Sequence, residues 1–359
     1  MMRSSTQGLR RNFVALLASL GMLDAHAVPF PDLYTVTVKA DAQATDQRAA
    51  AIELGMVSLL ARLTGRTNAG RHPDLTHIVE RASNYVNSYG LVDRETAQIG
   101  FIGSAVEQAV AAANWPLWGA ERPLTLVWMA VDAGNGERGI LASSLNAEEW
   151  TPEMAELMRS LHAQLQEAAK ARGLPLTLPL LDLFDIEAVS FADVAGGFSE
   201  RIATASERYR ADASLLALVR NGPFGPEIRW TLEQGGRRRI VLTSTIADGL
   251  DWVAERYAAE FSSAGAAGAL HISVLDVDSL EDYGRVMSYL ESVSLFESVD
   301  VESFQGTTLN LLVSVRGDET VLQRVLGLGG VLAAPTTLPF PPPPPGSVIF
   351  EVVEPGFVQ

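Results

Sequence analysis

LHISVLDVDSLEDYGRVMSYLE, residues 270–291, joins a predicted strand to a predicted helix and is the clearest structural signal in the chain. The apolar run over 270–276 predicts the strand. Ser279 and Asp282 have the spacing of a capping box, and the apolar residues that follow share one face of a helix over 279–291. A strand followed directly by an amphipathic helix indicates a module that mixes both kinds of element.

The same alternation continues to the end of the chain. The expected elements are a hairpin, a helix and a last strand, at 298–304 with 309–316, at 318–326 and at 347–353. The order β-α-β-β-α-β is the ferredoxin-like arrangement, and we expect the last strand to cover the open edge of the first, antiparallel to it. A Pro-rich insertion at 339–345 precedes that strand as a stiff spacer or, alternatively, as a ligand for aromatic grooves.

Two further modules precede this one. Residues 28–115 predict the order β-α-β-β-α, and residues 120–263 predict strands that alternate with helices. The central module is expected to contain a strand at 174–181 and a helix at 196–209. After a hinge at 264–268, the ferredoxin-like module occupies 269–359. The predicted fold class is therefore α+β, with three small α/β modules in series.

Residues 1–27 have the pattern of a cleavable secretory signal. Arg3, Arg10 and Arg11 precede a short apolar stretch, and Ala25-His26-Ala27 forms a small-x-small cleavage site. The apolar stretch is shorter than the roughly 20 residues that span a bilayer. We expect a periplasmic protein, cleaved near Ala27, with no transmembrane segment after cleavage.

The composition narrows the classes of partner and chemistry. A formal charge of −16 disfavours binding to nucleic acid or to anionic lipid, since both would be repelled. The sequence has no cysteine, which removes disulfides, thiol nucleophiles and thiolate metal sites. Lys39 and Lys170 are the only lysines, and no phosphate-binding Gly-Lys-Ser/Thr loop is present.

Two pairs of aspartates are weak candidates for a catalytic or metal-binding site. Asp276 and Asp278 follow a predicted strand and resemble the aspartyl-nucleophile loop of haloacid-dehalogenase-type phosphatases, but Leu280 replaces the expected Thr or Val and no lysine follows. The alternative is a strand end whose carboxylates cap the next helix. Asp182 and Asp185 leave the strand predicted to end at Leu181, where they could hold a metal or share a proton, or bind local backbone N–H groups.

Trp115 and Trp118 form the densest aromatic cluster, close to Pro116. Exposed indoles could stack on sugars or on a partner surface, whereas buried ones would fill a junction between modules. No His-Glu-x-x-His or Gly-x-Ser-x-Gly signature occurs, so the sequence supplies no complete catalytic set and predicts no metal and no cofactor.

Several short stretches taken together resemble the bacterial domain-of-unknown-function family 2066. These stretches, which together span about residues 33–260, are Ala61-Arg62-Leu63-Thr64-Gly65-Arg66, Trp118-Gly119 with Arg122-Pro123 and Leu126-Val127-Trp128, Arg172-Gly173-Leu174-Pro175 running to Pro179-Leu180-Leu181-Asp182, and Ala205-Ser206 with Arg208-Tyr209 and Asp212. The resemblance implies an exported proteobacterial protein and supplies no catalytic residue. The order of elements over 120–263 also looks like the periplasmic modules of the amino-terminal part of TolB, which is a likeness of layout alone.

The leading hypothesis is a non-enzymatic periplasmic protein of the cell envelope that acts through protein–protein interaction with other envelope proteins. One alternative is a metal-dependent hydrolase that uses Asp182 and Asp185 or the Asp276 loop. The other is a small-ligand carrier, which would need a deep apolar pocket.

Overall fold

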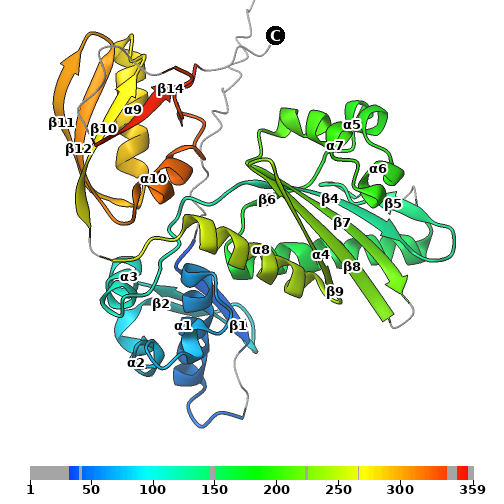
Figure 1. The fold of residues 1–359 in the computed structure, drawn as a ribbon. Helices are drawn as coiled ribbons and strands as arrows, with labels where there is room; N and C mark the ends of the chain where they lie inside the picture. Colours follow the sequence, from blue (N-terminus) through cyan, green and yellow to red (C-terminus); the bar gives the residue numbers. More distant parts are fainter. Residues whose placement is uncertain are drawn as a thin grey trace, which may run out of the picture.

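The computed structural model describes residues 32–39, 43–145, 150–222, 225–265, 267–337 and 346–354. It contains three β-sheets in consecutive stretches of chain, each with its own helices, so the α+β fold class with several small α/β modules is confirmed (Figure 1). The expected signal segment 1–27 and the Pro-rich insertion at 339–345 lie outside the described residues. No helix in the part of the chain described is long and apolar enough to cross a membrane.

The first sheet is antiparallel, in the order β1-β3-β2. Its elements are β1 (Thr35–Lys39), α1 (Gln47–Thr64), α2 (Thr76–Glu80), β2 (Val86–Leu91), β3 (Thr96–Phe101) and α3 (Gly103–Ala112). The Asp46 side chain accepts the Ala49 N–H at the start of α1, and Gly65 ends the helix in the left-handed region, with φ 70°. Both helix limits were predicted from these residue types and are confirmed.

The central sheet has the order β5-β4-β7-β8-β9, with β6 beside β4. Its strands are β4 (Thr125–Asp132), β5 (Arg138–Ile140), β6 (Leu176–Thr177), β7 (Ala213–Gly222), β8 (Gly225–Gln234) and β9 (Arg237–Thr243). Helices α4 (Pro152–Arg172) and α8 (Ile246–Phe261) cover one face. The other face is covered by α5 (Leu183–Ala188), α6 (Phe191–Gly196) and α7 (Ser199–Ser206), which leave β9 open on that side (Figure 1).

One prediction for the central sheet was wrong and another was right in part. The strand expected over 174–181 is only the two-residue β6. The helix expected over 196–209 begins later, as α7, and a 3-10 turn over Glu207–Tyr209 continues it. Leu181 turns the chain with a φ of 52°, and Asp182 and Ser190 then cap α5 and α6, which the sequence did not predict. The apolar residues around Leu181 resemble a buried strand in sequence, but many of them are exposed.

The third sheet has the order β11-β12-β10-β14-β13. Its elements are β10 (Gly268–Leu275), α9 (Leu280–Ser292), β11 (Phe296–Gln305), β12 (Thr308–Val315), α10 (Glu319–Leu326), β13 (Leu332–Ala333) and β14 (Ser347–Val352). The last strand does lie beside β10, but the two are parallel, so the expected antiparallel direction was wrong. The chain inserts β13 first, at the outer edge, and β14 returns antiparallel to β13.

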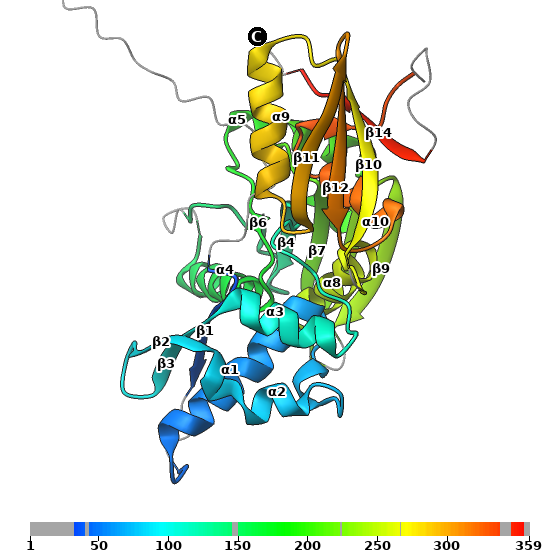
Figure 2. The same ribbon diagram turned by 90° about the vertical axis from the view of Figure 1, so that its left-hand side faces the viewer.

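The modules share buried surface. One cluster of buried apolar side chains runs from the α4 and α8 face of the central sheet into the third sheet and its helices. The first sheet and α1 have a separate cluster. In both views the first sheet lies beneath α4 and α8 (Figure 2). The contacts between the ends of α1 and α4 include hydrogen bonds from buried arginines.

Candidate functional site

Asp182 and Asp185 form a polar clamp at the start of α5, together with Arg208 and Tyr209 of the short turn that follows α7. Arg208 binds both carboxylate oxygens of Asp182, at 2.8 and 2.7 Å, and lies 3.4 Å from Oδ1 of Asp185. Oδ2 of Asp185, which is 1% exposed, accepts the Leu181 N–H at 2.9 Å and the Tyr209 hydroxyl at 2.5 Å. Oδ1 of Asp182 also accepts the Asp185 N–H, which caps the helix.

The electrostatics of the clamp follow from these contacts. The hydrogen bonds from Arg208 lower the pKa of Asp182 to about 2. Burial, followed by the bond to Asp185, raises the pKa of Tyr209 to about 12. Both carboxylates therefore have donors already, and the Tyr209 hydroxyl both donates to Asp185 and accepts the Leu180 N–H at 2.8 Å. This geometry positions the chain from Leu180 through α5.

The clamp presents apolar side chains to solvent. Leu183, Phe184 and Ile186 of α5 are 76%, 75% and 62% exposed, and Leu180 just before the helix is 53% exposed. We call these four residues the α5 patch. The guanidinium of Arg208 lies 5.7 Å from the centroid of the Phe184 ring. This cation–π contact joins the α5 patch to the clamp.

The second acidic pair lies elsewhere. Asp276 and Asp278 are exposed at the end of β10, on the third sheet, whereas Asp182 and Asp185 lie beside the central sheet (Figure 1). Asp276 adopts a left-handed conformation with a φ of 61°, and Ser279, not either aspartate, caps α9. Across the described ranges, no group of three or more His, Asp or Glu side chains could hold a metal ion.

Trp115 and Trp118 lie at the boundary between the first and central sheets. Trp118 is completely buried, with the Arg122 guanidinium 3.9 Å from its ring centroid and Tyr257 packed against its edge. Trp115 is 8% exposed and donates its indole N–H to Asp74 at 3.3 Å. The burial of Trp118 leaves none of its ring face for a sugar or a partner.

Three buried arginines, Arg62, Arg122 and Arg172, join α1 to α4, and sequence reasoning did not find this cluster. Arg122 donates to the carbonyl of Arg62 at the end of α1 and to those of Arg172 and Gly173 at the end of α4, as well as to Gly119 and Trp118. Arg62 reaches across to the Ala171 carbonyl, and Arg172 to the Gly65 carbonyl. Two helix carboxyl ends therefore meet, and cationic side chains satisfy their carbonyls.

These arginines stay charged although they are buried. Burial, followed by the charges of Arg62 and Arg172, lowers the pKa of Arg122 to about 9. Burial likewise lowers the pKa of Arg62 to about 10. Arg172 has a carboxylate partner, Asp251, at 3.1 Å. The helix carbonyls carry the partial negative charge that stabilises the other two guanidinium groups.

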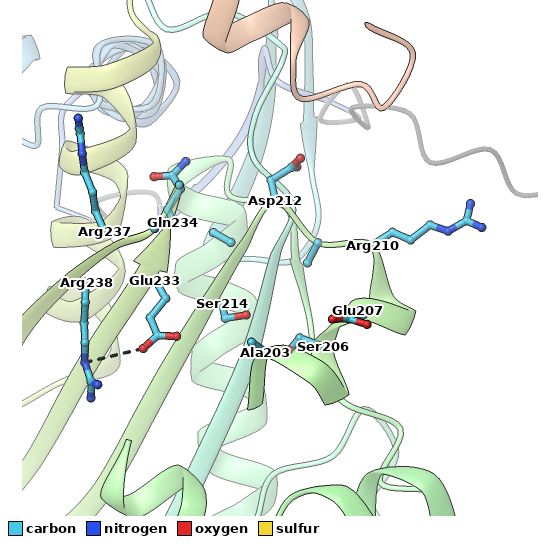
Figure 3. Close-up of a pocket in the computed structure, with 14 residues that line it drawn as sticks. Ala203, Ser206, Glu207, Arg210, Asp212, Ser214, Glu233, Gln234, Arg237 and Arg238 are labelled. Atoms are coloured by element: carbon cyan, nitrogen blue, oxygen red, sulfur yellow. Dashed lines mark ion pairs between the residues drawn. The ribbon is translucent and has the colours of Figure 1, made fainter. Parts of the chain in front are cut away.

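A surface pocket of about 460 Å³ opens between the end of α7 and the β8–β9 turn (Figure 3). Acidic and basic side chains are mixed with small uncharged ones in its lining, which is unlike a deep apolar ligand pocket. Arg210 and Arg237 point away from each other, while Arg238 lies 3.7 Å from Glu233. Asp212 accepts the Leu124 N–H at 2.7 Å, and burial nevertheless raises the pKa of Asp212 to about 6.

Asp212 gives the protein a predictable pH dependence. Because its pKa is raised in the folded chain, the unfolded chain loses this proton first as the pH rises from about 4 to about 6, and the free energy of unfolding falls. Asp212→Asn keeps an acceptor for Leu124 and removes the titration. Urea unfolding of both proteins should show the Asn variant gaining up to about 3 kcal/mol on the wild type across this range, and a constant difference would contradict it.

Comparison with known proteins gives a partial family match. The matching family model covers residues 27–119 and describes a domain of unknown function, DUF8605. The expected resemblance to family 2066 was therefore wrong, and three of its stretches supply Arg62, Arg122 and Arg172 of the arginine cluster. No curated protein matches the chain. A competence-damaged protein (CinA) superfamily structure from Escherichia coli is 15% identical, covers 44% of this chain and 84% of its own, and has a TM-score of 0.19, too low to support an argument.

Proposed function

We propose that this chain is a non-enzymatic protein of the bacterial cell envelope, exported to the periplasm, and that it binds other envelope proteins through the α5 patch. The observation that carries the proposal is the exposure of Leu183, Phe184 and Ile186 on a helix held in place by a buried carboxylate. The export part rests on the pattern of residues 1–27, which lie outside the described residues.

Physical arguments support a binding role for the patch. Clustered large apolar side chains on a soluble protein mark contact surfaces, and aromatic anchors dominate the energy of such contacts. A helix of six residues is too short to be stable alone, so the clamp supplies the order that α5 needs. An anchor that is already ordered loses less conformational entropy when it binds.

The contacts of the aspartates favour binding over catalysis. A metal ligand or a nucleophile needs carboxylate oxygens that are available to it, whereas those of Asp182 and Asp185 accept hydrogen bonds from Arg208, Tyr209 and backbone N–H groups. A small-ligand carrier is also less well supported, because charged side chains make up part of the lining of the pocket near Asp212.

Site-specific photocrosslinking in intact cells tests the proposal. A photoreactive phenylalanine analogue at position 184 should give discrete adducts with envelope proteins, and the same analogue at Gln166, exposed on α4 across the sheet, should not. Phe184→Ser should abolish function while the melting temperature stays unchanged, because the ring is 75% exposed. Equal crosslinking at both positions, or full function of Phe184→Ser, would show that the patch is not the contact surface.

A further inference from the structure

Two sheets of this chain end in open edge strands of opposite charge. β9 is the last strand of the central sheet and pairs only with β8, and β11 is the last strand of the third sheet and pairs only with β12, over the residues described. β9 has the sequence RRRIVLT, with three consecutive arginines, and β11 has FESVDVESFQ, with Glu297, Asp300 and Glu302. Each edge presents unpaired backbone N–H and C=O groups to solvent.

Both edges also expose apolar side chains. Ile240 and Leu242 on β9 are 59% and 60% exposed, on the sheet face that α5, α6 and α7 leave open. On β11, Val301 and Phe304 are 47% and 50% exposed. Exposed apolar residues on an open edge favour pairing with another strand, since charge alone would keep the edge solvated.

We propose that copies of this chain associate head to tail, with β9 of one copy adding to β11 of the next. Two β9 edges would bring like charges together, and so would two β11 edges, whereas β9 against β11 brings opposite charges together. The pattern therefore disfavours a two-fold contact and favours a heterologous one, which forms rings or open chains. The occupant of each edge is a second copy, because both halves of the contact are present in one sequence.

An antiparallel pairing fits the side chains. Placing Arg239 opposite Asp300 puts Ile240 opposite Val299, and Arg237 then lies near Glu302, where β11 has a bulge between Val301 and Ser303. The bond between Glu302 and His271, at 2.9 Å, places the Glu302 side chain beside the same sheet face as Asp300, whose strand neighbours are Leu312 and then His271. Like-face pairs of opposite charge stabilise neighbouring strands.

The ion pairs that these charged residues already form do not prevent β9 from pairing with β11 of another copy. Arg239 binds Glu260 of α8 at 2.6 Å, Arg238 lies 3.7 Å from Glu233, Glu297 lies 3.8 Å from Arg316, and Glu302 contacts His271. Each of these pairs is at least partly exposed. Exposed pairs of this kind contribute little free energy. The association does not involve the α5 patch, so it can fail or succeed independently of the proposed function.

Two charge-reversed variants of the mature chain test the proposal. Arg237→Glu with Arg238→Glu makes both edges acidic, and Asp300→Arg with Glu302→Arg makes both edges basic. In sedimentation velocity at low salt, the wild type should associate as its concentration rises, and each variant alone should associate at least about tenfold more weakly. An equal mixture of the two variants should recover association, because each edge then meets its opposite. Added salt should weaken association in every case.

Glu80→Arg with Glu95→Arg is the control for net charge, since both residues are exposed on the first module. It should associate like the wild type. If a double variant fails to melt cooperatively, Arg237→Glu and Asp300→Arg singly replace it in the same mixing experiment. A wild type that stays monomeric at all concentrations, variants that associate normally, or a mixture that shows no recovery would overturn the proposal. A monomer that binds an acidic peptide through β9 would do so as well.

Discussion

Arg122→Met is expected to destabilise the protein by at least about 3 kcal/mol. Methionine fills most of the volume but donates no hydrogen bond, so the carbonyls at the ends of α1 and α4 lose the donor that joins them. Each buried polar group left without a partner costs roughly 1–3 kcal/mol. Urea unfolding and hydrogen exchange should show that the ends of both helices lose protection together.

Arg159→Met on the same helix, α4, is the matched control. Its side chain is more than half exposed and forms an exposed ion pair with Glu156, so the change should alter the free energy of unfolding by less than about 0.5 kcal/mol. If Arg122→Met were as stable as this control, the arginine cluster would not be what joins the first module to the central one.

Asp185→Ala should destabilise α5 by about 2–4 kcal/mol, because the Leu181 N–H and the Tyr209 hydroxyl both lose their acceptor. Hydrogen exchange should increase between Leu180 and Ala188, and partner crosslinking at position 184 should fall although the α5 patch itself is unchanged in sequence. Tyr209→Phe, which removes one of the two bonds, should have a smaller effect in the same direction.

Asp278→Ala is the control for that experiment, because Asp278 is exposed at the end of β10 and is not a cap. It should leave hydrogen exchange in α5 and the overall stability nearly unchanged. If both alanine variants lost stability and hydrogen-exchange protection in α5 to a similar extent, the effect of Asp185→Ala would come from the lost negative charge. The hydrogen bonds of Asp185 would then not be what holds α5 in place.

Local sequence signals predicted much of the fold. Thr151 before Pro152 and Gly173 after Arg172 set the limits of α4, and Asp318 caps α10, as expected from their residue types. The direction of β14 could not be predicted, because it depends on β13, a strand of two residues with no periodicity of its own. The helices α5 and α6 were not predicted because six residues are too few to show a helical period.

The candidate site was predictable in part. The sequence indicates Asp182 and Asp185 as a pair, and binding of local backbone N–H groups is one of the alternatives that it predicts. Their partners Arg208 and Tyr209 lie more than 20 residues later, and no sequence pattern links them. The arginines at the ends of α1 and α4 had a signal, since each comes shortly before a helix-ending glycine, but nothing in the sequence shows that these two ends meet.

The meeting of α1 with α4 imposes an order on biosynthesis. Arg62 and its acceptor at Ala171 are separated by 109 positions along the chain. When α1 has been translated and α4 has not, the hydrogen-bond partners that α4 provides for the end of α1 do not yet exist. The first module can fold its own sheet early, but it reaches its final state only once α4 is complete, and contacts of such long range slow this last step. Until α4 is complete, the end of α1 lacks the guanidinium donor that Arg172 supplies to Gly65.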